Sequence, residues 1–462
     1  MITPSPAMTI GQRRVVWTVL ATITLAGLTL RILAARGGLW LDEAWSAVVA
    51  QDVRTPAGVF VRINHDNNHH LNSLWLQWVG GTAPPPLQRA LSIVTGAATI
   101  PLAAAIALRR GRAAAILAAI AFAASPFLVT FGSEARGYAP MLLALVAAIG
   151  VADRWLADPA TPPPTTAIAL AAIFGCLSQA TMLFALAALG TWVAVERWRS
   201  AGWRRAAQDA LRLFLPAAIA VVLLIAIAWT AAATSRDGFQ FGAREPHDMA
   251  KWLLAQEQLW TWSCGQWAVA PAIALAGWFV RDRIVGLVLL SAIGLPLAVA
   301  LLALPNSGAA RYYMIAVPPL LLLASITLPV LWTKRRIWRL PILAAGAVFC
   351  WTAIDRNLAL ITNLRGDPGR AVRTLAAVAP HGATVSVALS RSTAILNAAA
   401  RSRRYPLTIA DSPCAPFRFI ERDGYNPFPD RLIRCGRSFR EIARGDPTGL
   451  SGSHWRLYAR SR

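Results

Sequence analysis

Long apolar segments recur along the chain from Val15 to about Asp355, and they limit its fold more than any other feature. A helix needs about twenty residues to cross the hydrocarbon core of a bilayer, and most of the segments approach that length. In lipid the backbone must satisfy its own hydrogen bonds, so a spanning chain forms helices or a closed barrel whose strands alternate apolar and polar residues. The segments show no such alternation. The sequence therefore predicts an α-helical, polytopic membrane protein.

Arginine-rich loops between the segments predict the topology. The sequences RRGR, RWRSAGWRR, RDR and TKRRIWR each follow an apolar segment. Basic loops stay on the cytoplasmic side of a membrane, and a cytoplasmic N-terminus with about eleven spans places all of these loops there. The predicted spans are residues 15–35, 90–108, 113–131, 138–155, 165–177, 181–195, 211–233, 266–280, 284–304, 311–332 and 340–354.

The charge of the chain bears on its partners. There are 45 Lys and Arg residues against 22 Asp and Glu, a formal net charge of +23. Nucleic acid would suit this charge, but the arginines lie in short loops between spans and in the tail. That distribution is typical of topology signals and of a surface that rests on anionic lipid. We expect membrane lipids as partners and no nucleic acid.

The first outer loop, residues 36–88, contains two predicted helices that are too short to span. One lies near Trp45 to Gln51. The other begins near Leu71, has apolar residues at helical spacing through Val79, and ends at Gly80 and Gly81. Counting it as a span would move the arginine-rich loops to the outside, so we expect both helices to lie in the membrane interface.

The composition changes after residue 355, which divides the chain into a transmembrane domain, 1–355, and an outer C-terminal domain, 356–462. Apolar density falls in the tail, and short β-branched runs alternate with helical stretches. We expect a small, soluble, mixed α/β domain. Its predicted strands are residues 383–389, 407–410 and 455–458, and its predicted helices are residues 369–378 and 392–401.

Cysteine usage leaves one question open. The five cysteines form no CxxC motif and no metal-binding spacing. Cys414 and Cys435 both lie in the tail, and they can pair if the tail lies outside the cytoplasm.

Unusual polar residues from separate outer loops share one side of the membrane. A carboxylate at a membrane boundary is costly to desolvate, so each one needs a reason. An aspartate such as Asp42 can take the proton from an attacking hydroxyl, and arginines bind a phosphate and stabilise it as a leaving group. A phosphate at the interface is most naturally that of a lipid, so we expect group transfer from a lipid phosphate to a hydroxyl. The residues are Asp42, His69, His70, Glu134, Arg136, Tyr138 and Arg311.

Four motifs carry a resemblance to a known family. GLWLDEAWSA follows the first span, a histidine motif opens the second loop helix, SEARGYA follows the third span, and ARYYMIAVPPLLLLA comes late in the chain. Together they resemble the GT-C superfamily of membrane glycosyltransferases, most closely the family 39 and aminoarabinose-transferase-like group, which includes protein O-mannosyltransferases. The resemblance covers about residues 39–323.

The resemblance implies roles for individual residues. Asp42 matches the family's catalytic Asp, and Glu43 and Glu134 join it as expected catalytic residues. Expected to bind the phosphate of the donor are Arg136, Tyr138, Arg311, Tyr312, His69 and His70. The family often has His-Pro-Pro-Leu where this chain has His69-His70-Leu71-Asn72, and we expect His69 to take the family position.

The resemblance also implies an activity and a location. We expect an inverting glycosyltransferase of a bacterial inner membrane, multi-pass, with its N-terminus in the cytoplasm and its C-terminal domain in the periplasm. It would transfer a sugar from a polyprenyl-phosphate donor to a hydroxyl of a cell-envelope acceptor: a glycolipid, a polysaccharide or a protein. No cofactor is certain, no metal site is predicted, and a divalent cation stays open.

Simpler interpretations of these residues stay open as well. Asp42 and Glu43 suit the start of a helix, and histidines in a polar turn are often structural. Glu134 and Arg136 can pair with each other. A transporter or flippase of a lipid-linked or anionic solute is the alternative function, but the spans carry few ionisable residues at mid-depth, where transport pathways usually place them.

Overall fold

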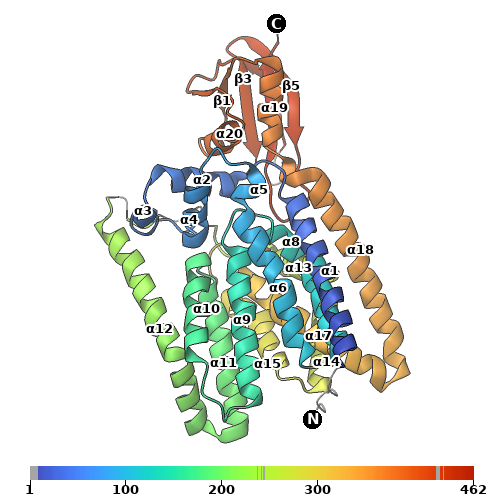
Figure 1. Cartoon of the computed structure of the whole chain (residues 1–462). Helices are drawn as coiled ribbons and strands as arrows, with labels where there is room; N and C mark the ends of the chain where they lie inside the picture. The colour runs from blue at the N-terminus through green and yellow to red at the C-terminus, as the bar shows by residue number, and fades with distance from the viewer. Residues whose placement is uncertain are drawn as a thin grey trace.

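The computed structural model describes residues 9–236, 238–240, 242, 245–422, 427–429 and 431–461. A bundle of long helices carries a sheet domain at one end, and a layer of short helices lies between them (Figure 1). The bundle contains α1 (Ile10–Ala34), α6 (Ala90–Leu108), α7 (Arg112–Ala124), α8 (Pro126–Phe131), α9 (Tyr138–Ala157), α10 (Thr165–Ser178), α11 (Met182–Ala201), α12 (Trp203–Thr234), α13 (Met249–Cys264), α14 (Val269–Val280), α15 (Ile284–Leu289), η1 (Leu290–Gly294), α16 (Leu295–Leu301), η2 (Ala310–Ala316), α17 (Val317–Lys334), η3 (Arg336–Trp338) and α18 (Arg339–Asn363).

Helices lie at each of the predicted spans, and most of them are long enough to cross a membrane. In the described part of the chain, seven helices are long and apolar enough to cross a membrane, and the bent pair α13–α14 makes up to eight. The other predicted spans correspond to α7, α10 and α11, of which α7 and α10 are shorter apolar helices. The chain is therefore a mostly helical, polytopic protein, as predicted from its hydropathy.

One predicted span is interrupted. Residues 113–131 form α7 and α8, with a break at Ser125. Pro126 is the first residue of α8, and a proline both lacks the N–H of a helix interior and disfavours helical backbone in the residue before it.

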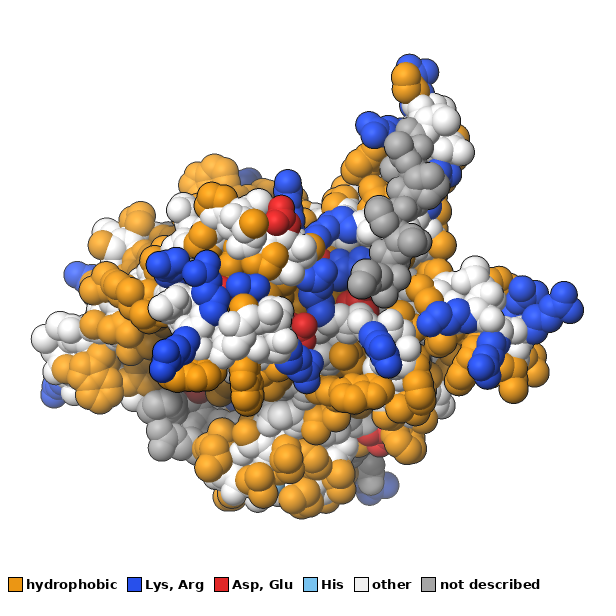
Figure 2. Space-filling view, turned by 90° about the horizontal axis from the view of Figure 1, so that it is seen from below, with side chains coloured by type: hydrophobic (Ala, Val, Ile, Leu, Met, Phe, Trp, Pro, Cys, Tyr) orange, Lys and Arg blue, Asp and Glu red, His pale blue; other side chains and the backbone are white. Residues whose placement is uncertain are grey.

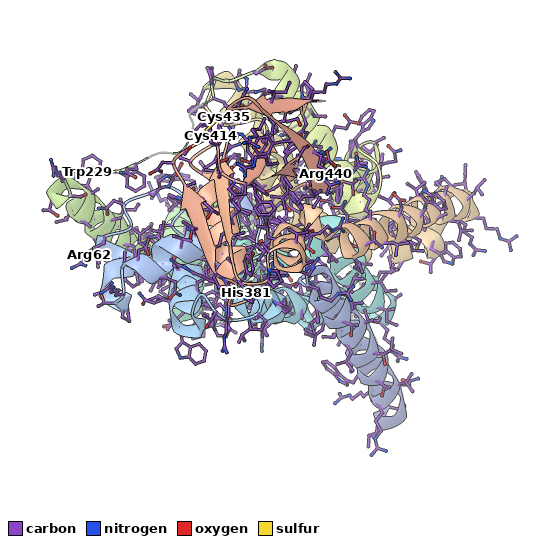
Figure 3. The ribbon with its side chains drawn as sticks, turned by 90° about the horizontal axis from the view of Figure 1, so that it is seen from above. Arg62, Trp229, His381, Cys414, Cys435 and Arg440 are labelled. Atoms are coloured by element: carbon purple, nitrogen blue, oxygen red, sulfur yellow. A yellow bond between two sulfur atoms is a disulfide. The ribbon has the colours of Figure 1, made fainter. Side chains whose placement is uncertain are left out.

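Four short helices form the layer between the bundle and the sheet domain (Figure 1). They are α2 (Leu41–Asp52), α3 (Pro56–Val61), α4 (His70–Val79) and α5 (Pro85–Gln88). α4 has ten residues and ends at Gly80, whose φ of 82° suits glycine. Seen from above, Arg62 and Trp229 lie at the same edge of the molecule, where α3 contacts α12 (Figure 3).

The C-terminal domain is a mixed six-stranded sheet with two helices against one face (Figure 1). The strand order is β2-β1-β3-β6-β5-β4; β1 is parallel to β2 and β3, and the other pairs are antiparallel. The predicted α/β character is confirmed. The elements are η4 (Leu364–Gly366), α19 (Gly369–Val378), β1 (Ala383–Val387), α20 (Ser392–Arg401), β2 (Leu407–Ala410), β3 (Phe417–Arg422), β4 (Leu432–Arg434), β5 (Arg437–Gly445) and β6 (His454–Arg460).

The sheet domain and the layer of short helices share a core. Trp455 and Phe419 of the sheet and Ile395 of α20 are fully buried in the same apolar cluster as Ala44 of α2 and Leu76 of α4. α18 runs through Asp355 without a break and ends at Asn363, close to the base of the sheet. The C-terminal domain is therefore packed directly on the helices of the first outer loop.

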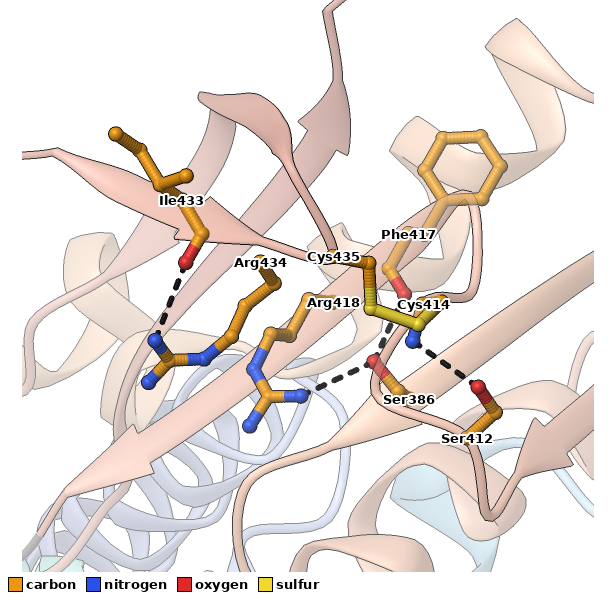
Figure 4. The surroundings of a disulfide bond; sticks show 8 residues. All are labelled: Ser386, Ser412, Cys414, Phe417, Arg418, Ile433, Arg434 and Cys435. Atoms are coloured by element: carbon orange, nitrogen blue, oxygen red, sulfur yellow. Dashed lines mark hydrogen bonds between the residues drawn. A yellow bond between two sulfur atoms is a disulfide. The ribbon is translucent and has the colours of Figure 1, made fainter.

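A disulfide closes one edge of the sheet. Cys414 and Cys435 are bonded, with Cα atoms 5.8 Å apart, and they link the segment before β3 to the turn after β4 (Figure 4). The sequence had left this pairing open.

The opposite end of the molecule is basic. Figure 2 shows many Lys and Arg side chains gathered on the face farthest from the sheet, surrounded by hydrophobic side chains. Buried ion pairs fasten the helices there: Arg110 bonds to Asp153 of α9 and, at 3.2 Å, to Asp282 before α15. This is the face that the predicted topology assigns to the cytoplasm.

Candidate active site

The start of α2 presents two carboxylates in different directions. Successive residues of a helix point about 100° apart, so Asp42 and Glu43 cannot share an environment. The Asp42 side chain is 24% exposed, whereas Glu43 is completely buried. Both lie in the first turn, where free backbone N–H groups favour negative charge.

Two arginines from distant segments lie beside the carboxylate of Asp42. Arg136, in the turn between α8 and α9, donates from Nη1 to Oδ2 of Asp42. Arg311 of η2 places Nη2 at 3.9 Å from the same oxygen. Three segments that are far apart in sequence thus converge on one carboxylate, as the shared outer face predicted. We call Asp42, Arg136 and Arg311 the Asp42 cluster.

The neighbours of Arg136 fix its orientation. Its Nη2 donates to Oδ1 of Asn67 at 2.6 Å and to the hydroxyl of Tyr138 at 3.1 Å. The guanidinium also stacks on the ring of Tyr138, 5.0 Å from its centre. Asn67 in turn donates to Ser46 of α2 at 3.1 Å. Arg136 is 4% exposed, so the cluster has a rigid, buried side and a partly open side at Asp42.

Arg311 is the more accessible of the two arginines. Its side chain is 28% exposed, and its guanidinium lies 5.5 Å from the ring centre of Tyr312. Among the described residues, its Nε has no hydrogen-bond partner. Arg311 therefore has free donor capacity beside Asp42.

His69 lies behind the cluster and is neutral. Its Nδ1 is 3.1 Å from the carbonyl of Ser178, which can only accept, so Nδ1 carries the proton. Burial lowers the pKa of His69 well below 6.5, and the charge of Arg136 adds to that effect. Its ring packs edge-on to Tyr138, with centres 5.4 Å apart.

Gly137 is required for this close packing. A Cβ atom at Gly137 would lie 1.6 Å from the carbonyl oxygen of Ser178 and 3.0 Å from Nδ1 of His69. Any side chain there would displace α4 from the end of α10.

The side chain of His70 packs against α3 and not against the Asp42 cluster. Its ring stacks on Phe60 of α3, with centres 5.1 Å apart, and burial lowers its pKa below 6.5. Within the described residues, it has no hydrogen bond or ion pair with the Asp42 cluster. The two histidines expected at the phosphate are thus separated, with only His69 near Arg136.

Glu43 belongs to a buried network under the cluster. Arg89 holds it with two hydrogen bonds, of 2.8 Å to Oε1 and 2.5 Å to Oε2. The backbone N–H groups of Ala135 and Trp40 donate to the same oxygens at 2.6 and 3.1 Å. Burial raises the pKa of this carboxyl, but Arg89 and these hydrogen bonds outweigh that effect and lower it. Glu43 is ionised, and each of its oxygens accepts two hydrogen bonds.

Glu134 is buried beside a different arginine. Ser451 donates to its Oε1, and Nε of Arg365 lies 3.5 Å from the same atom. Burial raises the pKa of Glu134, and the nearby charge of Glu43 also raises it, against the effect of Arg365. Glu134 therefore faces Arg365, and the pairing with Arg136 that the sequence left open is not formed.

The described residues do not form a ready-made site for a divalent cation. In the described ranges, no group of three or more His, Cys, Asp or Glu side chains converges. Both oxygens of Glu43 bond to Arg89, and Oδ2 of Asp42 lies beside Arg136 and Arg311.

Several residues that shape the site were not predicted. Arg89 could have been found from the sequence. Arginines gather in cytoplasmic loops, whereas the predicted topology places Arg89 at the other end of a span. The contacts of Asn67, Arg365 and Ser451 depend on tertiary structure, and no local pattern marks them.

A cavity of about 890 Å³ lies elsewhere, on the C-terminal sheet. Its lining includes Phe428, Arg440 and Arg456, and none of its residues belongs to the Asp42 cluster. The candidate site is therefore identified by its charged side chains and not by this cavity.

Comparison with known proteins supports the fold. No family model and no curated protein sequence matches the chain. Matching solved structures include ArnT from Cupriavidus metallidurans in the apo state, with a TM-score of 0.62 and 13% identity over 96% of this chain and 97% of that one. The same protein bound to undecaprenyl phosphate matches with a TM-score of 0.59 and 13% identity, covering 96% and 98%.

Archaeal oligosaccharyltransferase AglB from Archaeoglobus fulgidus, solved with an inhibitory peptide and a dolichol-phosphate, is also similar. It matches with a TM-score of 0.52 and 13% identity, over 89% of this chain and 70% of that one. The resemblance of the sequence to the aminoarabinose-transferase-like group is thus confirmed at the level of structure: the chain has the fold of ArnT over almost its whole length.

Proposed function

We propose that the protein is an inverting membrane glycosyltransferase that moves a sugar from a polyprenyl-phosphate donor to a hydroxyl of a cell-envelope acceptor. The observation that carries the proposal is the Asp42 cluster. A partly exposed carboxylate lies between two arginines at the outer end of a membrane bundle. This combination suits a base beside a lipid phosphate.

The chemistry follows from these groups. Asp42 takes the proton from the acceptor hydroxyl, whose oxygen attacks the anomeric carbon of the sugar. The bond between that carbon and the phosphate oxygen breaks on the opposite face, and the configuration inverts. Arg136 and Arg311 stabilise the polyprenyl phosphate that leaves, because guanidinium groups bind phosphate oxygens bidentately.

The resting ion pair suits this cycle. Without donor, Arg136 pairs with Asp42 and keeps a buried charge compensated. A donor phosphate competes for the guanidinium, and an arginine drawn to the phosphate leaves the carboxylate free to accept a proton. Donor binding would thus activate the base.

The nature of the donor is proposed from two sources. Arginines at the outer end of a membrane bundle suit a lipid phosphate. ArnT and AglB, which share the fold, have been solved with undecaprenyl phosphate and with a dolichol-phosphate. The acceptor is proposed only as a class, a hydroxyl on a glycolipid, a polysaccharide or a protein.

The remaining expected site residues have supporting roles in this proposal. Tyr138 and Tyr312 orient the arginines on which they stack. Neutral His69 supports Tyr138, and His70 holds α3 to α4 through Phe60. The carboxylates of Glu43 and Glu134, which we expected to be catalytic, instead hold the backbone around the cluster through their buried arginines.

We propose the topology on the same basis. About eleven spans from a cytoplasmic N-terminus bring the Asp42 cluster and the C-terminal domain, residues 356–462, to the periplasmic side of a bacterial inner membrane. The basic face in Figure 2 and the disulfide both suit this orientation, because disulfides persist in the periplasm.

Transfer by the purified protein in lipid nanodiscs tests the function. The donors are a panel of polyprenyl-phosphate sugars, and a membrane extract supplies acceptors. We expect acceptor-dependent release of free polyprenyl phosphate. The absence of release from every donor, with labelled lipid crossing a sealed bilayer instead, would favour a flippase.

A further inference from the structure

A short segment of the C-terminal domain bonds to Leu41, which precedes Asp42, and to Glu134, which lies in the same turn as Arg136. The segment is residues 450–453, immediately before β6. We infer that Ser451 and Ser453 are positioning residues that fix the backbones of Asp42 and Arg136 relative to each other. The inference rests on the proposed function.

Ser453 supplies a hydrogen bond that α2 cannot supply for itself. The first N–H groups of a helix have no partner within the helix, and the residue that precedes α2 is Trp40, whose side chain makes no cap. The hydroxyl of Ser453 accepts from the N–H of Leu41 at 3.3 Å, across 412 residues of sequence. Asp42 is the next residue, so this bond fixes the backbone that carries the proposed base.

Ser451 acts on the turn that carries Arg136. Its hydroxyl donates to Glu134, which lies in the turn that carries Arg136. Within that turn the N–H of Arg136 donates to the carbonyl of Glu134 at 2.9 Å. A displacement of Glu134 would therefore move the backbone of Arg136 directly.

The segment is itself firmly held. Gly452 has a φ of 142°, which glycine adopts without strain, and a Cβ there would lie 2.8 Å from the carbonyl oxygen of Arg365. That same carbonyl accepts from the N–H of Ser453 at 3.3 Å, and Nε of Arg365 donates to the hydroxyl of Ser451, also at 3.3 Å. Trp455 adds a bond from its indole to the carbonyl of Gly366 at 2.8 Å. The two hydroxyls thus project from a rigid base.

A second contact supports the same arrangement. Oδ1 of Asp367 accepts from the N–H of Gly38, before α2, at 2.8 Å. The C-terminal domain therefore holds the approach to α2 at two points, Gly38 and Leu41.

The geometry determines what the serines affect. Ser451 and Ser453 are 9% and 2% exposed, and they contact backbone and a buried carboxylate rather than the open side of the Asp42 cluster. Their loss leaves the donor's binding groups in place but loosens the base relative to the arginine. Small displacements of catalytic groups reduce the rate of the chemical step more than substrate binding.

The test compares Ser451→Ala, Ser453→Ala and the double variant with Ser438→Ala, which removes an exposed hydroxyl of the same sheet. We expect kcat to fall about tenfold in each single variant and further in the double variant. The KM for donor and the Kd for undecaprenyl phosphate should stay within about twofold of wild type. Ser453→Thr, which keeps the hydroxyl, should recover most of the rate.

Two readouts separate positioning from general damage. Tm should change little in the single variants, whereas hydrogen exchange should quicken in the peptide covering residues 38–52 of Ser453→Ala. An unchanged kcat in both single variants would overturn the inference. Comparable losses in kcat, KM and Tm would overturn it as well, because they would indicate general damage to the fold. A wild type without transfer activity would overturn the proposed function instead. In that case the exchange measurement alone decides whether Ser453 holds α2, and unchanged exchange would overturn the inference too.

Discussion

Arg136 bonds to the carboxylate of Asp42 across 94 residues of sequence, and the same two segments are joined a second time where the N–H of Ala135 donates to Glu43. Asp42 is held by the first turn of α2, and Arg136 by Asn67, Tyr138 and its own turn. The partly exposed carboxylate of Asp42 thus pairs with an arginine whose guanidinium is held in place by its neighbours.

Replacing the arginines by lysine tests their separate contributions. Lysine keeps the charge but loses the planar fork that binds a phosphate through two bonds. We expect Arg136→Lys to lower kcat/KM about a hundredfold, as for loss of one preorganised donor. Arg311→Lys should lower it about tenfold, since Arg311 is more exposed and lies farther from Asp42. Arg62→Lys, at an exposed position beyond α3, is the control and should be silent. Equal effects of all three changes would contradict these assignments.

Glu43→Gln should destabilise the protein strongly. The change removes the charge that compensates Arg89, which is 1% exposed, and loss of one partner of a buried ion pair costs about 3–5 kcal/mol. A thermal unfolding scan in detergent measures the effect, with Asp52→Asn at the exposed end of the same helix as the control. A Glu43→Gln variant with wild-type Tm and no activity would instead indicate a catalytic Glu43.

Stability should depend on pH through His69. Its pKa in the folded protein is lowered well below 6.5, mainly by burial, so the unfolded chain binds the proton more readily. Stability is therefore full above pH 6.5 and falls as the pH drops toward the folded pKa. His69→Asn keeps a donor for Ser178 and should flatten the fall in Tm between pH 7 and pH 5.5 relative to wild type, whereas His381→Gln, at an exposed site, should leave it unchanged. An identical fall in the His69→Asn protein would argue against this role.

Breaking the disulfide should affect stability and leave the rate unchanged. Cys414 and Cys435 are separated by 21 residues, and closing a loop of that size stabilises a fold by about 3 kcal/mol. We expect the Cys414→Ser, Cys435→Ser protein to show a lower unfolding temperature for the sheet domain. At assay temperatures well below that unfolding temperature, its transfer rate should equal that of the wild type. A reduced rate with unchanged Tm would contradict the prediction.

The sequence predicted the bundle better than the sheet. Apolar segments mark membrane helices because the bilayer imposes their length and composition, and helices occur at every predicted span. β3, β4 and β5 were missed because arginines interrupt their apolar residues, as in Arg437–Gly445. These strands are stabilised by pairing with β6 and by burial on one face, which a local pattern does not record.

Some residues of the candidate site could be predicted from the sequence and others could not. Asp42, Arg136 and Arg311 were predicted together because they lie in separate loops that the predicted topology places on one face of the membrane. Ser453 was missed because a serine in a polar tail is common, and only the folded chain brings it to the N-terminus of α2.

The most direct measurement follows release of polyprenyl phosphate by the wild type, Asp42→Asn and Asp52→Asn in nanodiscs, with matched protein and acceptor. If Asp42 is the base, Asp42→Asn loses nearly all acceptor-dependent release while it still binds undecaprenyl phosphate, and Asp52→Asn keeps the wild-type rate. Full transfer by Asp42→Asn would contradict the role of Asp42 as the catalytic base.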